Sequence, residues 1–118
     1  MAKKILIIEN ETDVNEVLEE ELKKESYETI VAASGEEGIS RIKASNPDLV
    51  ILDLSVIEGG FKVLYQIKSN FKDLPVIAIS NSGQEFEVNQ AKELGAEDIA
   101  VKTQFDPQSI VEKIKKIV

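Results

Sequence analysis

The sequence contains no cysteine and no histidine among its 118 residues. Without cysteine the chain can form neither a disulfide nor a thiolate metal site. Without histidine it lacks imidazole general bases, catalytic triads and the usual ligands of zinc. No apolar stretch approaches the roughly 20 residues that a membrane-spanning helix needs, and no signal-peptide pattern follows Met1. We therefore expect a soluble, cytoplasmic protein with no membrane contact.

Positive charge is also in short supply. The chain has 14 basic against 22 acidic residues, which gives a formal net charge of −8. A chain this acidic repels nucleic-acid phosphates unless a local basic patch overrides the repulsion. The lysines near the two ends form only short clusters, as expected of a solvated surface. We therefore expect no direct binding of nucleic acid.

Five short apolar runs alternate with amphipathic stretches, a pattern typical of βα units over a parallel sheet covered on both faces. The strands are predicted at residues 4–9, 27–32, 49–52, 75–79 and 99–101. The unbroken apolar run at residues 49–52 favours a central strand, whereas the less hydrophobic run at residues 27–32 favours a sheet edge. Since no linker or repeat interrupts the pattern, we expect one domain, residues 1–118.

Helix signals lie between these runs. The first helix is predicted to bury four apolar residues, Val14, Val17, Leu18 and Leu22. Ser34 and Glu37 have the spacing of a capping box at the start of the second helix. The fourth helix is predicted at residues 84–94, and Asp106 with Pro107 predicts an N-cap and a first helical residue for the last helix.

Polar side chains follow four of the apolar runs. Glu9 and Asn10 follow the first, Asp53 the third, Ser80 the fourth and Lys102 the fifth. The carboxyl ends of parallel strands meet at one edge of a sheet, so we expect these groups to share one pocket. No glycine-rich phosphate loop follows the first run. Its acids would repel a phosphate unless a cation such as Mg²⁺, which prefers one or two carboxylates with waters and a phosphate oxygen, stood between them.

These residue types together suit phosphoryl transfer. With Mg²⁺ held by Glu9, Asn10 and Asp53, the Asp53 carboxylate can act as the nucleophile. Lys102 would neutralise the phosphoryl oxygens and Ser80 would donate a hydrogen bond to them. Taken singly, each residue has an ordinary alternative, because a strand-end Asp often caps a turn and a strand-end Lys is usually solvated. The prediction therefore depends on the combination.

Four segments carry a resemblance to a known family. Residues 4–11, 47–54, 75–80 and 95–102 match the receiver domain of two-component response regulators in order and spacing. The resemblance covers essentially the whole chain. It implies a doubly wound α/β fold, with a five-stranded parallel sheet of order 2-1-3-4-5 and five helices.

The resemblance also implies a role for each site residue. It makes Asp53 the phospho-acceptor, Glu9 and Asn10 the metal-binding pair, the carbonyl of Ser55 a further Mg²⁺ ligand, Ser80 the switch hydroxyl and Lys102 the phosphate-contacting lysine. In the family, a sensor histidine kinase or a phosphotransfer protein donates the phosphoryl group, and an output domain or protein receives the signal. Such a domain is not an enzyme with a separate substrate, because it catalyses only its own phosphoryl transfer and hydrolysis.

The chain departs from the family pattern at five places. They are Asn10 in place of a second acid, Ile99 in place of the aromatic switch residue, Asn81 in place of a small residue, Thr103 in place of a proline, and a loop at residues 54–60 that is one residue short. The neutral Asn10 is expected to weaken the Mg²⁺ site. Ile99 removes the usual coupling to the switch hydroxyl, and Asn81 is expected to crowd the phosphoryl group.

Two other functions are considered at this level, and only the first of them remains open. The first is a pseudo-receiver, a protein-interaction module whose partner surface does not respond to phosphorylation. The second is a flavodoxin-like or cobalamin-binding carrier, which shares the topology but needs different site residues. A flavin-phosphate loop would need Ser, Thr and Gly where residues 9–13 stand, and a cobalamin ligand histidine is absent. The cognate kinase, the output and the oligomeric state, including a homodimer, stay open.

Overall fold

The structure is a computed structural model that describes residues 2–54, 59–81, 83–101 and 106–118. Strands and helices alternate along the chain in five βα units. Their bounds are β1 (Lys4–Ile8), α1 (Thr12–Lys24), β2 (Glu28–Ala32), α2 (Gly35–Ser45), β3 (Leu49–Asp53), α3 (Gly60–Asn70), β4 (Val76–Ser80), α4 (Glu85–Glu93), β5 (Asp98–Val101) and α5 (Pro107–Ile117). Within the described ranges, no helix is long and apolar enough to cross a membrane.

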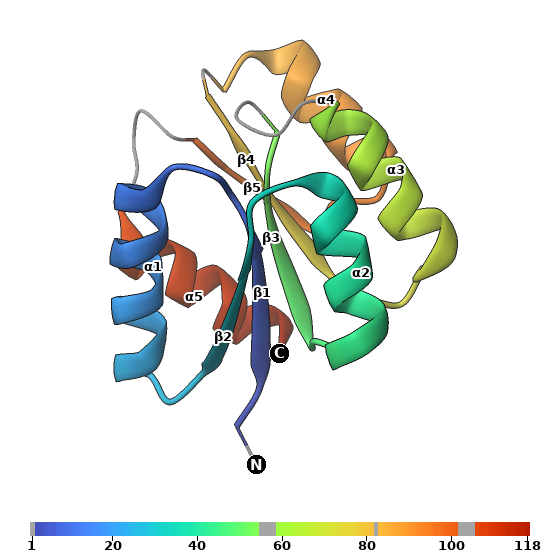
Figure 1. The fold of residues 1–118 in the computed structure, drawn as a ribbon. Coiled ribbons are helices and arrows are strands. Elements are labelled where there is room, and N and C mark those ends of the chain that lie inside the picture. Colours follow the sequence, from blue (N-terminus) through green and yellow to red (C-terminus); the bar gives the residue numbers. More distant parts are fainter. Residues whose placement is uncertain (1, 55–58, 82, 102–105) are drawn as a thin grey trace.

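The five strands are parallel and lie in the order β2-β1-β3-β4-β5. This confirms the predicted fold class. β3, in which every residue is buried, lies at the centre, and β2, in which most residues are half-buried or exposed, lies at an edge. All carboxyl ends meet at one edge, which is uppermost in Figure 1. The topology therefore brings the residues that follow the strands together.

Helices cover both faces of the sheet, α1 and α5 on one and α2, α3 and α4 on the other (Figure 1). Alternation along the strands divides the core in two. The cluster beneath α1 and α5 includes Ile5, Ile7, Leu18, Leu22, Leu49, Ile51, Ile77, Ile79, Ile110 and Ile114. The cluster beneath α2, α3 and α4 includes Leu6, Ile8, Ile42, Val50, Leu52, Leu64, Ile67 and Ala78. Each large side chain buried here contributes about 1.5–3 kcal/mol to folding.

Most strand ends differ from the predictions by one residue. β1 ends at Ile8, although the Glu9 N–H still donates to the Ala32 carbonyl at 3.0 Å. β2 begins one residue later than predicted and β5 one residue earlier. β3 extends to Asp53 and β4 to Ser80, because backbone pairing continues past the last apolar residue. Hydrophobicity marks the buried part of a strand rather than the full ladder.

The helix signals are partly confirmed. The Ser34 hydroxyl accepts from the Glu37 N–H at 3.1 Å, but Glu37 Oε2 accepts from the N–H of Ala33 instead of Ser34, so the capping box is half formed. Asp106 Oδ1 accepts from the Gln108 N–H at 3.1 Å, and the proline that follows Asp106 is the first helical residue. α4 is one residue shorter at each end than predicted, because the terminal residues are its caps.

Val17 was wrongly predicted to be buried, since 44% of it is exposed. Leu18 and Leu22, one turn apart, face the sheet and are fully buried. Val17 is rotated from Leu18 by about 100° around the helix axis, away from that contact. Spacing alone did not separate the centre of the apolar stripe from its rim.

The packing weakens toward one side of the sheet. α4 buries one of its nine residues, Ala91, whereas α5 buries Ile110, Val111 and Ile114. All four residues of β5 are half-buried. The part of the fold formed by α4 and β5 is therefore held by less apolar contact than the rest.

Candidate functional site

Two acidic residues lie level with each other at the ends of neighbouring strands. Ile8 of β1 pairs with Leu52 of β3, and the residues that follow them are Glu9 and Asp53. Neighbouring strands lie about 4.8 Å apart. Both acidic side chains are fully buried, and strand alternation places them on the α1/α5 face with Ile51. The structure therefore brings together the two acids that the sequence singled out.

Two buried carboxylates at adjacent positions lose hydration and repel each other. Part of the compensation comes from the loop between β1 and α1. The Glu11 N–H donates to Glu9 Oε1 at 2.9 Å. Asn15 Nδ2 of α1 donates to the backbone carbonyl of Glu9 at 3.0 Å, which holds the loop but does not compensate the carboxylate. A divalent cation bound between Glu9 and Asp53 would relieve the remaining repulsion. This chemistry fits Mg²⁺.

The structure says less about Asn10, the other predicted side-chain ligand of the metal. Asn10 follows the buried Glu9 directly, and its side chain is exposed. No cluster of three or more Asp or Glu side chains within the described ranges forms a protein cage for a metal. Such a sparse site suits Mg²⁺, which keeps several waters and takes oxygens from a phosphate.

Ser80 lies at the end of β4, one residue beyond Ile79, the pairing partner of Asp53. It is 2% exposed, so its hydroxyl must find partners inside the protein. The hydroxyl donates to Glu87 Oε2 of α4 at 3.1 Å and accepts from the Gly83 N–H at 3.1 Å. The predicted switch hydroxyl thus lies at the strand-end edge and is bonded to α4.

Sequence reasoning missed Gly83 and Glu87. Gly83 has a φ of +69°, and a Cβ at this position would lie 2.8 Å from a methyl carbon of Val101. The loop therefore needs glycine twice over, for its backbone conformation and for its close approach to β5. A glycine soon after a strand end is the signal that could have identified it. Glu87 had no such signal, because its bond to Ser80 depends on where α4 lies.

Lys102 and Ser55 lie outside the described residues, as do Thr103 and most of the shortened loop at residues 54–60. Their predicted roles stay predictions. The structure does show the register of β5, the strand that precedes Lys102: its last residue, Val101, pairs with Ser80 of β4. β5 therefore ends at the same edge as β4.

Besides Asn10, two of the departures from the family pattern can be placed. Ile99 is half-buried in β5 and packs against the cluster beneath α2, α3 and α4. Asn81 follows Ser80 and is exposed, so the predicted crowding of a phosphoryl group stays a prediction.

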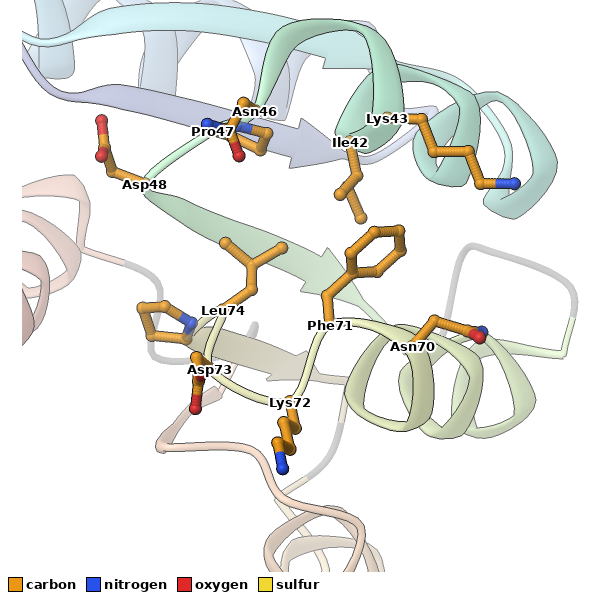
Figure 2. A pocket seen from close by; sticks show the side chains of 11 residues that line it. Ile42, Lys43, Asn46, Pro47, Asp48, Asn70, Phe71, Lys72, Asp73 and Leu74 are labelled. Atoms are coloured by element: carbon orange, nitrogen blue, oxygen red, sulfur yellow. The ribbon is translucent and has the colours of Figure 1, made fainter.

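A cavity of about 670 Å³ lies at the opposite edge of the sheet, between the α2–β3 and α3–β4 connections. In Figure 2 the side chain of Ile42 points toward the ring of Phe71, and Leu74 lies beside them. The carboxylate of Asp48 accepts from the Lys4 N–H at 2.8 Å, a structural contact at the start of β1. This cavity lacks the paired buried acids, so the candidate site is the strand-end edge.

Comparisons with known proteins agree with this geometry. Residues 5–115 match the family described as response regulator receiver domain. The alkaline phosphatase synthesis transcriptional regulatory protein PhoP of Bacillus subtilis (strain 168) is 30% identical over 118 residues, which are 99% of this chain and 49% of PhoP. The probable transcriptional regulator ycf27 of Cyanophora paradoxa is 31% identical over 116 residues, which are 98% of this chain and 48% of ycf27. The chain spans about half the length of these relatives.

Solved structures show the same architecture. The receiver domain of NtrX from Brucella abortus matches with a TM-score of 0.88 and 27% identity, over 96% of each chain. The chemotaxis protein CheY4 of Vibrio cholerae matches with a TM-score of 0.91 over the whole of both chains, at 20% identity, which supports the fold alone. Sequence match, sheet order and paired buried acids together show that the chain belongs to the response regulator receiver domains of two-component systems.

Proposed function

We propose that Asp53 accepts a phosphoryl group from the phosphohistidine of a sensor histidine kinase or a phosphotransfer protein. The observation that carries the proposal is the fully buried Asp53 at the end of the central strand, level with the fully buried Glu9. A carboxylate that only capped a turn would be solvated and would need no second buried acid beside it. The pair makes sense as a site for a cation and an anion together.

The transfer conserves atoms and charge. An Asp53 carboxylate oxygen forms a bond to phosphorus, while the bond between phosphorus and the donor imidazole nitrogen breaks and leaves its electron pair on that nitrogen. Hydrolysis returns the Asp53 carboxylate and releases inorganic phosphate. The domain therefore acts only on its own phosphoryl group and is not an enzyme with a separate substrate.

Mg²⁺ is the cofactor that these residues fit. Glu9 and Asp53 would supply carboxylates, Asn10 an amide oxygen and Ser55 its backbone carbonyl. Bound Mg²⁺ would neutralise the acids and the phosphoryl oxygens, which is the main requirement of phosphoryl transfer. Because Asn10 is neutral, we expect the ion to bind more weakly than it would beside a second acid.

Ser80 and Lys102 would receive the phosphoryl oxygens. The Ser80 hydroxyl supplies a neutral hydrogen-bond donor from β4, and the Lys102 ammonium supplies a compact positive charge after β5. The register of β4 and β5 at the same edge supports this assignment.

The phosphorylated domain would signal to an output domain or to a separate protein. PhoP and ycf27 are named as transcriptional regulators and are about twice as long as this chain. The net charge of −8 argues against DNA contact by the receiver itself. We place the exchange in the cytoplasm, where such regulators meet their kinases.

The competing function is a pseudo-receiver, which binds its partner without phosphorylation. Two observations favour it: Asn10 removes one charge from the metal site, and the Ser80 hydroxyl is already bonded to Glu87. Both would make a phosphoryl group harder to accept.

The test uses beryllofluoride, which mimics the phosphoryl group, together with Mg²⁺. We expect the amide resonances of Glu9, Asp53 and Ser80 to shift in the wild type, but not in Asp53→Asn. The control is Asp73→Asn, an exposed acid at the opposite edge of the sheet, which should respond as the wild type does. A wild type that does not respond at saturating Mg²⁺ would favour the pseudo-receiver.

A further inference from the structure

The Ser80 hydroxyl has one proton, and in this structure that proton is donated to Glu87. The oxygens Ser80 Oγ and Glu87 Oε2 are 3.1 Å apart. The Gly83 N–H, at 3.1 Å, donates to the same hydroxyl oxygen and therefore cannot replace Glu87 as an acceptor. A serine hydroxyl is one donor with two acceptor lone pairs. Its single donor is committed to α4.

A phosphoryl group on Asp53 would need the same proton. Phosphoryl oxygens are acceptors, so Ser80 can serve them only by donating. It cannot donate to Glu87 and to a phosphoryl oxygen in full at the same time. The Glu87 carboxylate is also anionic, so like charge opposes the arrival of a phosphoryl group on the neighbouring strand end.

The Ser80–Glu87 bond matters to α4 because that helix is weakly buried. Among its nine residues, only Ala91 is buried. Glu87 lies in the first turn and is half-buried. Ser80, in contrast, belongs to β4, in which every residue is buried. The bond therefore ties a weakly packed helix to a firmly packed strand.

We propose that Glu87 is a positioning residue which holds the Ser80 hydroxyl in a state that cannot serve the phosphoryl group, so that phosphorylation and the attachment of α4 exclude each other. The proposal deepens the proposed function and rests on it. The Ser80 hydroxyl can donate its proton to a phosphoryl oxygen only after its hydrogen bond to Glu87 has broken. The release of Glu87 removes a tie on the first turn of α4.

This contact also offers a route for the signal in a chain that has Ile99 where the family has an aromatic residue. An isoleucine packed against the core cannot report on Ser80 as a mobile ring can. The Glu87 carboxylate contacts Ser80 directly and lies on α4. The coupling then requires no movement of Ile99.

The experiment measures the rate of Asp53 phosphorylation by acetyl phosphate and Mg²⁺. We expect Glu87→Ala to raise this rate on the order of tenfold, the value of a hydrogen bond to a charged acceptor. Glu87→Gln keeps the shape and a neutral acceptor, so a smaller rise is expected. The control is Glu85→Ala, which removes an exposed charge from the same helix turn and should leave the rate nearly unchanged.

A second background separates the hydroxyl from the charge. In Ser80→Ala protein, Glu87→Ala should give no further increase, because no proton remains to be contested. An equal increase in both backgrounds would mean that charge alone acts, and would overturn the proposal. Phosphorylation of the wild type at the same rate as Glu87→Ala and Glu87→Gln would overturn it too, but would leave the proposed function intact. If neither the wild type nor any Glu87 variant is phosphorylated at Asp53, the proposed function fails and this proposal fails with it.

Discussion

The β1–β3 part of the strand-end edge and the β4–α4–β5 part hold their polar groups in different ways. Glu9 directly follows β1, and Asp53 is the last residue of β3. Both are fully buried, as are the apolar residues of these two strands. Ser80 is bonded to α4, which buries one residue, and lies beside β5, in which all residues are half-buried. Segments with few buried apolar contacts open and move most readily. We therefore expect Glu9 and Asp53 to keep their positions, and we expect the β4–α4–β5 part to move when the site is phosphorylated.

The largest effect on stability should come from shortening an isoleucine side chain in the β1–β3 part, compared with the same change in the β4–α4–β5 part. Ile51 of β3 is fully buried, whereas Ile99 of β5 is half-buried. Ile51→Ala should lower the free energy of unfolding by about 2–5 kcal/mol, the range for a buried aliphatic residue. Ile99→Ala should cost clearly less, since part of its surface is already hydrated. Urea denaturation measures both, and equal losses would remove the distinction between the two parts.

The second largest effect should come from Glu97, which precedes β5 and ties it to α3 and β4 at the opposite edge of the sheet. Glu97 accepts from Lys68 Nζ at 2.9 Å and from the Val76 N–H, and Lys68 Nζ also donates to the Leu74 carbonyl. Glu97→Ala leaves a poorly exposed ammonium without its carboxylate, so we expect a loss of about 2 kcal/mol in the free energy of unfolding.

The matched control for Glu97 is Glu20→Ala. Glu20 pairs with Lys24 at 3.8 Å on the exposed side of α1. Exposed pairs one turn apart contribute about 0.3–0.5 kcal/mol. If both variants lose the same small amount, Glu97 is another surface pair and does not fasten the fold.

The third largest effect should come from a change of charge at the acidic pair. Asn10→Asp adds one negative charge beside Glu9 and Asp53. At a screened dielectric the added attraction to a divalent ion is on the order of 1 kcal/mol, so the Mg²⁺ affinity should rise roughly tenfold. The same charge repels the buried acids, so the metal-free protein should melt at a lower temperature, with the loss reversed by Mg²⁺.

A Mg²⁺ titration followed by amide shifts, together with melting curves, checks both parts of the Asn10 prediction. The control is Asn70→Asp, which adds the same charge on the exposed end of α3. Unchanged affinity together with unchanged metal-free stability in Asn10→Asp would show that Asn10 does not face the site.

The smallest effect should be a pH-dependent one on the firmly packed side, where Lys115 of α5 is hydrogen-bonded to Glu25 at the end of α1. This bond raises the pKa of Lys115 above its ordinary value of 10.5. A raised pKa stabilises the fold below the ordinary value, and that stabilisation is lost as the pH rises through the higher, folded value. Lys115→Met should therefore lower the melting temperature slightly at pH 7 and no longer do so at strongly alkaline pH. Lys116→Met, an exposed neighbour, is the control.

Much of the fold could be predicted because this sheet separates burial from exposure clearly. The run at residues 49–52 has no polar interruption, and it forms the central strand that such a run indicates. Asp53 was correctly placed at its end. Val17 was not correctly placed, because helical spacing does not locate the rim of an apolar face.

The contacts that cross between elements could not be predicted. Ser80 and Glu87 are seven residues apart and belong to different elements, so no periodicity relates them. Glycine is needed at position 83 because the backbone there approaches Val101, and this close approach exists only in the folded chain. The sequence predicted that Glu9, Asp53 and Ser80 lie at one edge of the sheet, but it did not predict that Ser80 is bonded to Gly83 and Glu87.

The central claim is that Asp53 carries the phosphoryl group. The most direct measurement is to treat the protein with acetyl phosphate and Mg²⁺, reduce the acyl phosphate with borohydride, and map the peptides by mass spectrometry. We predict that Asp53 alone is converted to homoserine, and that the conversion disappears when Mg²⁺ is chelated. An Asp53 peptide that stays unmodified at saturating phosphodonor and Mg²⁺ would contradict the account, as would conversion of a different acid.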